Sequence, residues 1–401
     1  KEELLNVKKV MKSGILSGFF AKREKEKGFL GGKFVQDFEK KICDYFQVKH
    51  AISINSWTSG LQTAVGAIDI QPGDEVIVTP WTMCATVSAI VSWLAIPVFA
   101  DIDPKTLNLS PKSVEKCISK RTKAIMVADI HGLSSDMDSL LKIAKKHNLK
   151  IINDSAQSPG AKYKGKFVGA IGDIGGFSLN YHKHIQTGEG GVLVTNDEII
   201  AQKCRLIRNH AESIMNENEP LSNMIGSNYR MGEIEAAIGI AQLKKLKRII
   251  KSRQKIGNLV SGILNQYDFI KVLPTPKNYE HVYYVVPILY EPKLTGVPRS
   301  KLVDALSKEG LNNTIYGGYA NIHLLPMFQK KIAFGNKGIP WKSEFYKGMV
   351  NYNKGICPVA EEYHEKKFIC LCSCMIEGKE KDLLKIEKIF NKVLRNISEL
   401  R

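Results

Sequence analysis

The first two-thirds of the chain alternates short apolar runs with stretches whose apolar residues recur at helical spacing. Most of the short runs are continuously apolar, which is typical of strands that are buried on both faces. Strands of this kind require helices on both sides of the sheet, and the alternation supplies them. The pattern therefore predicts an α/β fold built around a mostly parallel sheet. We expect its strands at residues 51–55, 75–79, 96–100, 123–130, 150–154, 175–179 and 191–195.

The last third of the chain follows a different order, and a long basic helix over residues 231–264 leads into it. Because 401 residues exceed what one simple core usually holds, we predict two domains of unequal size. The large domain covers 1–248 with an N-terminal helical segment, and a smaller C-terminal α+β domain covers 249–401. The elements expected in the second domain are strands at 282–289 and 368–372, helices at 299–309 and 380–395, and a long loop at 329–346.

The formal net charge of the chain is +18, which raises the question of a nucleic-acid partner. The lysines are scattered over predicted helix faces, as at Lys244, Lys247 and Lys251, and are not interleaved with aromatic residues as a stacking platform requires. We therefore expect no nucleic-acid partner. The positive charge also suits a phosphorylated substrate.

Neither hydropathy nor cysteine usage points to a membrane or to an oxidising compartment. No apolar run reaches the roughly 20 residues of a spanning helix, and Glu2 and Glu3 help to break up any signal-peptide core. The eight cysteines lack a framework pattern, which favours reduced thiols in a cytoplasmic protein. Cys370, Cys372 and Cys374 alternate as on one face of a strand. No matching Cys or His pair stands at zinc-ligand spacing, so no metal site is expected.

Polar motifs follow the ends of several predicted strands. In parallel α/β sheets, ligands bind beyond the carboxyl ends of the strands. We therefore expect these motifs to converge on one site. They lie at residues 55–60, 80–82, 154–157 and 178–183.

The most informative motif is GFSLNYHKHIQTGEGG over residues 176–191, in which Lys183 follows a strand end and glycines close the turn. A lysine forms imines with aldehydes, and it works when desolvation lowers its pKa to roughly 7–8. Glycines allow the backbone to approach a ring and its phosphate closely. Taken alone, however, a lysine near glycines is more often a solvated surface charge.

Two further motifs have both a functional and a structural interpretation. Asp154 ends a buried strand, where a carboxylate needs a cationic partner such as a pyridinium N–H, although turn residues of this type are common. Residues 55–60 join a strand to a helix, where backbone N–H groups hold a phosphate. Ser and Thr at that position also serve as ordinary N-caps. Neither motif is decisive by itself.

Together these motifs resemble the sugar aminotransferase family of fold-type I PLP-dependent enzymes, and in particular its nucleotide-sugar aminotransferases. The resemblance runs from Phe29 to the final helix, with several segments in the family's order and spacing. It implies the fold-type I PLP-transferase fold, pyridoxal 5'-phosphate as the cofactor, and a homodimer with shared active sites. The matching segments are residues 31–32, 55–61, 154–157, 177–191, 208–210, 228–231 and 357–361.

The resemblance assigns roles at the ring of the cofactor. Lys183 would form the Schiff base and carry the proton between substrate and cofactor. Asp154 would pair with the pyridine nitrogen, and Gln157 would contact the ring hydroxyl. Ala156 would pack near the ring face. Where the family usually stacks an aromatic side chain on the ring, this chain has Met83, whose thioether can take that place.

The resemblance also assigns the residues that hold the phosphate of the cofactor. Thr58, Ser59 and Ser178 would hold the phosphate within the same chain. Asn228 would reach the phosphate of the neighbouring subunit, which is why the resemblance implies shared active sites.

Four further residues are expected to contact the substrate: Trp81, His182, Tyr229 and His323. His323 lies in a segment that family members carry near the substrate, and a hydrogen-bonded structural histidine is the alternative. The basic segment 328–346 either lines a substrate entrance or is a solvated loop, and the second interpretation is favoured because loops lie mostly on the surface.

The function that the resemblance implies is transfer of an amino group from an amino acid, with L-glutamate expected, to the keto group of a nucleotide-linked sugar in surface polysaccharide biosynthesis. An alternative acceptor is a small phosphorylated ketone such as dihydroxyacetone phosphate. Some relatives have histidine in place of the lysine and act as sugar dehydratases, whereas Lys183 favours transamination. A DNA-binding regulator would need an added helix-turn-helix, and none is visible in the sequence.

Overall fold

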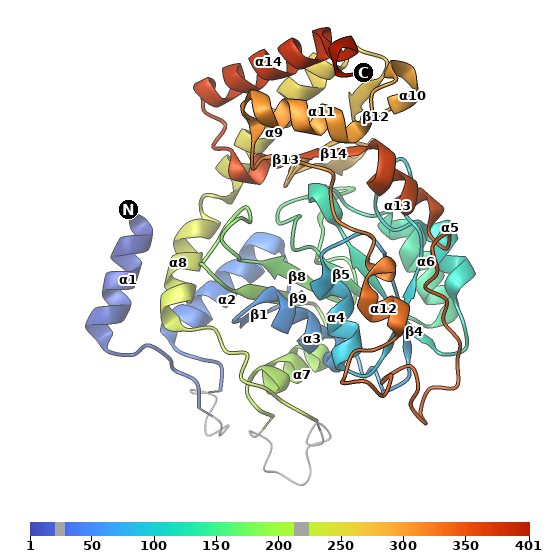
Figure 1. Cartoon of the computed structure of the whole chain (residues 1–401). Coiled ribbons are helices and arrows are strands. Elements are labelled where there is room, and N and C mark those ends of the chain that lie inside the picture. Colours follow the sequence, from blue (N-terminus) through green and yellow to red (C-terminus); the bar gives the residue numbers. More distant parts are fainter. Residues whose placement is uncertain (21–28, 212–223) are drawn as a thin grey trace.

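The computed structural model describes residues 1–20, 29–211 and 224–401. Figure 1 shows two bodies, a lower one around a seven-stranded sheet and an upper one around a four-stranded sheet. The lower body is the α/β architecture that the alternating pattern predicts. All seven strands expected from the first two-thirds of the chain are present in its sheet.

The large sheet is mostly parallel. In spatial order its strands are β1 (His50–Ile54), β9 (Gly191–Thr195), β8 (Ile174–Ser178), β5 (Lys150–Asp154), β4 (Thr122–Ala128), β2 (Glu75–Val78) and β3 (Ile96–Phe99). The strands from β8 to β3 pair in parallel, whereas β9 runs antiparallel to both β1 and β8. The parallel strands therefore bring the polar motifs at their carboxyl ends to one edge of the sheet.

Helices cover both faces of this sheet because both faces are apolar. In β4, Ala124 and Met126 pack into the core on one face, and Ile125 and Val127 pack into the core on the other. The first core includes α3 (Trp57–Ala67), α4 (Cys84–Ser92) and α7 (Glu198–Arg208). The opposite face is covered by α2 (Lys33–Phe46), α5 (Pro111–Cys117), α6 (Met137–His147) and α8 (Glu233–Leu243), and α1 (Glu2–Ser13) packs on α8.

The upper body has its own sheet and its own core. Its strands are all antiparallel to their neighbours, in the order β10 (Ile270–Val272), β12 (Val286–Tyr290), β14 (Phe368–Leu371) and β13 (Ile315–Tyr316). The helices α9 (Leu246–Leu264), α11 (Arg299–Leu306) and α14 (Glu380–Arg395) pack against it. Shorter elements are α10 (Pro292–Thr295), α12 (Pro326–Lys330), α13 (Pro358–Glu362) and a third sheet of β11 (Tyr279–Glu280), β6 (Lys162–Tyr163) and β7 (Lys166–Phe167). Across the described residues, no helix combines the length and the apolar character needed to cross a membrane.

The predicted helix over 231–264 is two helices. α8 ends at Leu243 and α9 begins at Leu246, because Lys245 N bonds to Gln242 O in a tighter turn. The predicted domain boundary after residue 248 falls inside α9, which runs from the lower body into the upper one (Figure 1). The division into domains at that residue stays a prediction.

The strand predicted at 282–289 begins four residues later, at Val286. Tyr283 has a left-handed φ of 47°, which a strand cannot accommodate. The residues before β12 bond instead to the large sheet's loops, where Val282 N donates to Gly132 O at 2.9 Å. The path of the chain before β12 matters for the site, because the side chain of Tyr284 there faces Lys183.

The basic segment 328–346 packs beside the edge strand β3 and does not line the cavity described below. Tyr346 donates a hydrogen bond to Glu75 at the start of β2, at the opposite end of the strand from the polar motifs. Tyr352, just beyond the segment, donates to Pro97 O of β3 at 2.7 Å, which blunts that exposed edge. The side chain of Lys330 is exposed, as is that of Lys342, so the structure supports the solvated-loop interpretation.

Candidate active site

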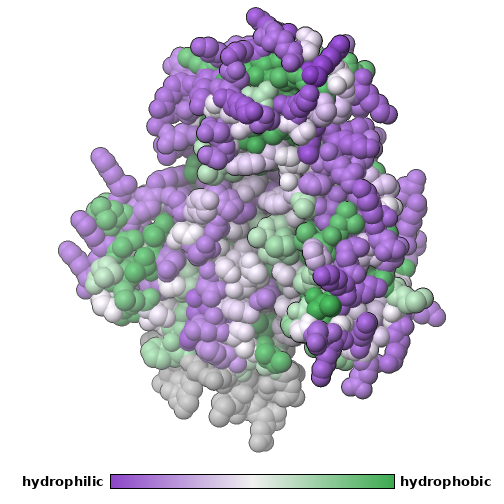
Figure 2. Space-filling view, viewed as in Figure 1, coloured by the Kyte–Doolittle hydropathy of each residue, from purple (hydrophilic) through white to green (hydrophobic). Residues whose placement is uncertain are grey.

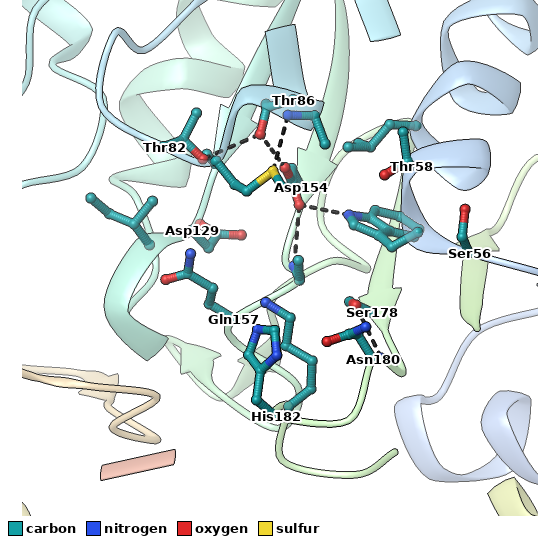
Figure 3. Close-up of a pocket in the computed structure, with 18 of the residues that line it drawn as sticks. Ser56, Thr58, Thr82, Thr86, Asp129, Asp154, Gln157, Ser178, Asn180 and His182 are labelled. Atoms are coloured by element: carbon teal, nitrogen blue, oxygen red, sulfur yellow. Dashed lines mark hydrogen bonds between the residues drawn. The ribbon is translucent and has the colours of Figure 1, made fainter. Parts of the chain in front are cut away.

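The predicted polar motifs meet at one cavity beyond the carboxyl ends of β4, β5 and β8 (Figure 3). The N-terminal ends of α3 and α4 form one wall, and Tyr319 enters from the segment after β13. The candidate site therefore lies at the strand ends, where the sequence predicts it. The lining residues are Ser56, Trp57, Thr58, Leu61, Thr82, Met83, Ala85, Thr86, Ala128, Asp129, Ile130, Asp154, Ala156, Gln157, Ser178, Asn180, His182, Lys183, Glu189 and Tyr319.

Lys183 lies in the turn between β8 and β9, and the turn is closed by backbone hydrogen bonds. Leu179 N donates to Gly190 O at 2.9 Å, and Lys183 N donates to Asn180 O at 2.9 Å. Gly190 has a φ of 151°, and a Cβ there would stand 2.6 Å from the hydroxyl of Thr187. The glycine is therefore required by the tight closure of the loop that presents the lysine.

The amine of Lys183 is set in a largely desolvated environment. Burial lowers the pKa of Lys183 to about 8, while the negative charge of Asp154 raises it. The Nζ atom lies 4.6 Å from the centroid of the Tyr284 ring. Arg253 of α9 donates to the backbone oxygen of Lys183 at 3.2 Å, so α9 helps to hold the backbone of the lysine in place. A lysine of this kind can attack a carbonyl carbon near neutral pH.

Asp154 faces the same cavity and is held by side chains from two helices. Trp57 Nε1 donates to Oδ1 at 2.7 Å, and Thr86 Oγ1 donates to Oδ2 at 2.7 Å (Figure 3). The backbone N–H of Ala156 adds a third bond to Oδ1 at 3.2 Å. Asp154 is only 7% exposed, and its carboxylate is therefore fixed in position with its charge directed at the cavity.

Gln157 is oriented by two partners. Its Oε1 accepts from His131 N at 2.8 Å, and its Nε2 donates to Tyr319 Oη at 3.0 Å. The amide nitrogen carries two hydrogens, so one of them is free to bond to a group in the cavity. Ala156 lines the cavity beside it and leaves room for a flat ring.

The N-terminus of α3 forms the end of the cavity next to Ser178. Ser56 caps this helix by accepting from Ser59 N at 3.1 Å. Thr58 and Ser178 line the cavity as predicted, and so does Ser56 of the predicted motif 55–60, to which no role was assigned. The structure does not bring Ser59 to the cavity wall, because its side chain is buried and its hydroxyl bonds to that of Ser56 at 2.8 Å.

Met83, and not Trp81, stands at the cavity. Met83 is 50% exposed, and its sulfur accepts from Ala85 N at the start of α4. Trp81 is fully buried and is not among the lining residues, and its indole donates to Tyr319 O at 2.6 Å. The expectation that Trp81 contacts the substrate is therefore corrected, because the indole packs against Phe368 behind the cavity wall.

His182 is the predicted substrate residue that does line the cavity. Burial lowers the pKa of His182 to about 4, and the charge of Lys183 contributes to the lowering, so the ring is neutral near pH 7. Its Nδ1 atom is buried without a partner among the described residues. Such an atom can accept a hydrogen bond from a bound ligand, or donate one to it.

His323 and Tyr229 lie outside the cavity of their own chain. His323 is fully buried and bonds to Glu361 at 2.9 Å, so it has the structural role that was the alternative. Tyr229 donates to Gln62 at 2.7 Å in a separate surface hollow. The expectation that His323 contacts the substrate is therefore corrected, whereas a substrate contact of Tyr229 stays a prediction.

Asn228 likewise stands outside the cavity of its own chain. Its Oδ1 accepts from Arg230 Nε at 2.9 Å, and its backbone oxygen accepts from Asn55 at 3.3 Å. The role predicted for it, in the site of a neighbouring subunit, stays a prediction.

Sequence reasoning missed several side chains that support the site. Asp129 follows β4 as Asp154 ends β5, so the strand-end rule could have found it. Burial raises the pKa of Asp129 to about 6, and its carboxylate accepts from Ser135 N at 2.8 Å and Ser155 Oγ at 2.6 Å. Trp57 lies in the predicted motif 55–60, but its contact with Asp154, like that of Tyr319 with Gln157, carries no signal in the sequence because it depends on the tertiary fold.

The alternating cysteines do not share one face of a strand, because β14 ends at Leu371 and the chain then turns. Cys370 is buried in the core as expected, and its sulfur lies 3.9 Å from that of Cys372. Within the parts of the chain that the structure describes, no group of His, Cys, Asp and Glu side chains could hold a metal ion.

Comparison with known proteins places the chain among enzymes. The profile of the DegT/DnrJ/EryC1/StrS aminotransferase family matches residues 20–368. The spore coat polysaccharide biosynthesis protein SpsC of Bacillus subtilis is 34% identical over 359 residues, which are 86% of this chain and 88% of that protein. GDP-perosamine synthase of Escherichia coli O157:H7 is 35% identical over 300 residues, 75% of this chain and 80% of that enzyme. The X-ray structure of the aminotransferase from Psychrobacter cryohalolentis matches with a TM-score of 0.82 at 27% identity, covering 98% of this chain and 97% of that one.

Proposed function

Because this chain belongs to the DegT/DnrJ/EryC1/StrS aminotransferase family, we propose that it transfers an amino group from L-glutamate to the keto group of a nucleotide-linked sugar. The family is one of PLP-dependent aminotransferases, so the chain is a PLP-dependent aminotransferase with the fold-type I architecture that its sequence predicts. The observation that carries the proposal is the amine of Lys183, which is buried and faces the same cavity as the carboxylate of Asp154.

The ring of the cofactor would lie at the end of the cavity that Asp154 and Gln157 line, the ring end. Asp154, already held by neutral donors, would pair with the ring nitrogen, and the free amide hydrogen of Gln157 would reach the ring hydroxyl. Ala156 and Met83 would pack on the two sides of the ring. When bound, the cofactor supplies an electron sink that stabilises negative charge at the substrate carbon.

The phosphate of the cofactor would lie at the other end of the cavity, beside Ser178 and the start of α3, the phosphate end. The backbone N–H groups at the start of α3 point out of an 11-residue helix, and that end of a helix favours anions. The hydroxyls of Thr58 and Ser178 line the same wall. Ser59 would act through the helix and not through its hydroxyl, which Ser56 already engages.

Lys183 would serve twice, first as the amine that attaches the cofactor and then as the base that moves a proton. With a pKa of about 8, the amine of Lys183 can both lose and regain a proton near neutral pH. His182 beside it would offer a neutral imidazole to a substrate hydroxyl. These roles need no further titratable group at the reacting carbon.

The acceptor and the location of the enzyme are proposed from its relatives. GDP-perosamine synthase, 35% identical, bears the name of an enzyme that makes a nucleotide-linked amino sugar, and SpsC is named for polysaccharide biosynthesis. We therefore place the enzyme in cytoplasmic synthesis of a surface polysaccharide, which its eight free cysteines suit. A small phosphorylated ketone is the second candidate acceptor, because the net charge of +18 favours any phosphate-bearing substrate.

A dehydratase is the second class of enzyme to consider. It would leave the sugar without a stable new amine, and it would not need a lysine amine in the cavity. The buried amine of Lys183 in the cavity favours transamination.

We further propose that the enzyme is a homodimer with shared active sites. Among the described residues that line the cavity, Asp129, Asp154 and Glu189 are acidic, while Lys183 is the one lysine or arginine. A phosphate and a carboxylate-bearing donor need more positive charge than this, and a second copy would supply it. Apolar side chains also gather on the outer face of α1, at the left of Figure 2, where Leu4 is 60% exposed.

The test is a substrate screen on the purified protein loaded with PLP. L-Glutamate or L-glutamine is offered with either a nucleotide-linked keto sugar or dihydroxyacetone phosphate, and release of the donor's keto acid (2-oxoglutarate from L-glutamate) is scored together with the aminated product. We expect release with the nucleotide-linked sugar. Turnover of the three-carbon ketone alone would overturn the acceptor, turnover with L-glutamine alone would overturn the donor, and loss of a sugar hydroxyl without amine formation would establish a dehydratase.

A further inference from the structure

We propose that Trp57 is a positioning residue that fixes the carboxylate of Asp154, with Thr86 as the second support. The inference rests on the proposed function, because it takes Asp154 to be the partner of the ring nitrogen. Trp57 opens α3, the helix whose N-terminus faces the phosphate end, and its indole reaches across to the ring end. The residue thus links two parts of the site that lie on different elements.

The hydrogen bonds divide the carboxylate between two helices. The indole N–H of Trp57 donates to Oδ1 at 2.7 Å, and the hydroxyl of Thr86 on α4 donates to Oδ2 at 2.7 Å. Because the hydroxyl hydrogen of Thr86 is used in this bond, Thr82 must donate to Thr86 across the 3.2 Å between their hydroxyls (Figure 3). A side-chain donor on each oxygen, together with the Ala156 N–H on Oδ1, fixes the plane of the carboxylate and not only its distance.

Both supports are neutral, and this choice has a consequence. An arginine or lysine in either place would neutralise Asp154 and compete with a cationic ring nitrogen. An indole and a hydroxyl orient the carboxylate and leave its net charge directed at the cavity. Trp57 is suited to this work because a rigid indole loses little conformational freedom when it is fixed.

The surrounding backbone leaves room for the indole. A Cβ at Gly60 would stand 2.7 Å from the ring of Trp57, and a Cβ at Gly176 would stand 2.6 Å from it. At Gly191 a Cβ would lie 2.9 Å from the backbone of Trp57. None of these three glycines has a left-handed φ, so the indole and its backbone, and not a turn, account for the lack of side chains at Gly60 and Gly191. At Gly176 the oxygen of Val192 adds a second restriction.

The first experiment compares Trp57→Phe with Trp93→Phe in the PLP-loaded enzyme. Trp93 is a matched control, because its indole also donates at 2.7 Å, to Gln62 O, and also packs over a glycine, Gly66. We expect Trp57→Phe to lose PLP about tenfold faster on gel filtration, and to lower kcat about tenfold with the KM for L-glutamate unchanged, since a hydrogen bond to a charged group is lost. Trp93→Phe should stay within about twofold of the wild type.

The second experiment removes the other support and guards against misfolding of the first variant. Thr86→Val deletes the donor to Oδ2 with little change of shape, and Thr63→Val is its control, because Thr63 donates to a backbone oxygen of α3 at 2.8 Å. We expect Thr86→Val to shift the visible absorbance band and to lower kcat, again without a change in KM. Circular dichroism confirms that each variant is folded.

The outcomes separate this inference from the proposed function. If Asp154→Asn loses the visible band of the wild type while Trp57→Phe and Thr86→Val match their controls, Asp154 acts as proposed and the positioning role is wrong. If the wild type itself shows no PLP band, the proposed function fails first. Equal effects of Trp57→Phe and Trp93→Phe on melting temperature and kcat would reduce Trp57 to a packing residue and overturn the inference.

Discussion

The two ends of the cavity are built in different ways. At the ring end, Asp154 is held by Trp57 and Thr86, and Gln157 is held by His131 and Tyr319, all within one chain. At the phosphate end, the described lining offers hydroxyls and a helix N-terminus, and its one lysine is Lys183, which attaches the cofactor in our proposal. One chain can thus position the groups that direct the chemistry, whereas in our account anion binding depends on backbone dipoles and on a second copy.

The largest expected effect lies at the ring end. Asp154→Asn keeps the shape of the side chain but removes the buried charge that faces the ring nitrogen. We expect cofactor affinity and kcat to fall about 100-fold each, because truncating one partner of a buried charged pair costs roughly 2–5 kcal/mol. Equilibrium dialysis with PLP and steady-state kinetics measure the two quantities. A loss below about threefold would mean that the ring nitrogen does not meet Asp154.

The next effect is a pH dependence set by Lys183. Because burial lowers the pKa of Lys183 to about 8, the reactive neutral amine is the minor form at pH 7 and the major form at pH 9. The rate at which cofactor-free protein takes up PLP should therefore rise about tenfold from pH 7 to pH 9 and then level off. His182, with a pKa of about 4, does not titrate in this range. A rate still climbing steeply at pH 10 would indicate a solvated lysine.

A smaller effect tests whether the phosphate end is shared. Asn228→Ala should weaken PLP binding about fivefold, since one hydrogen bond to the phosphate is lost while the other donors at that end remain. The sharper readout is a mixture of Asn228→Ala with Lys183→Ala. If Asn228 acts across the dimer, the hybrid has one intact site, and at a PLP concentration below the Kd of the wild type its activity exceeds that of either parent. If the hybrids are no more active than the parent variants, Asn228 does not act in the partner's site.

The smallest effect is expected from Ser178→Ala at the same end. Ser178 accepts from Asn180 N at 3.3 Å, a long bond, and shares its wall with Thr58 and the helix N-terminus. We expect a loss of PLP affinity of about threefold, because the remaining donors still face the phosphate. Titration of cofactor-free protein with PLP checks this. A loss as large as that of Asp154→Asn would contradict the difference between the two ends.

The convergence of some site residues could be predicted from the sequence alone, because their positions follow from the ends of strands. Lys183, Asp154 and Gln157 each lie at or just beyond the end of a buried strand of the large sheet, and a parallel sheet brings such residues together. The mostly parallel sheet itself followed from short, continuously apolar runs, which only strands covered on both faces can bury.

The remaining residues could not be predicted because local pattern does not determine their direction. Trp81 and Met83 lie two residues apart near a helix start, and only the tertiary contact of Trp81 with Tyr319 O turns it away. The strand predicted from residue 282 was interrupted by the left-handed Tyr283, which apolar periodicity does not reveal. His323 forms a buried hydrogen bond with Glu361, 38 residues later in the chain, which a local pattern cannot reveal.

The central claim is that the amine of Lys183 carries the cofactor, and chemical trapping tests it most directly. The PLP-loaded enzyme is reduced with sodium borohydride, digested, and analysed by mass spectrometry for the phosphopyridoxyl group. We expect the group on the peptide that contains Lys183, and no trapping in Lys183→Ala. A phosphopyridoxyl group on another lysine, or undiminished trapping in Lys183→Ala, would contradict the account.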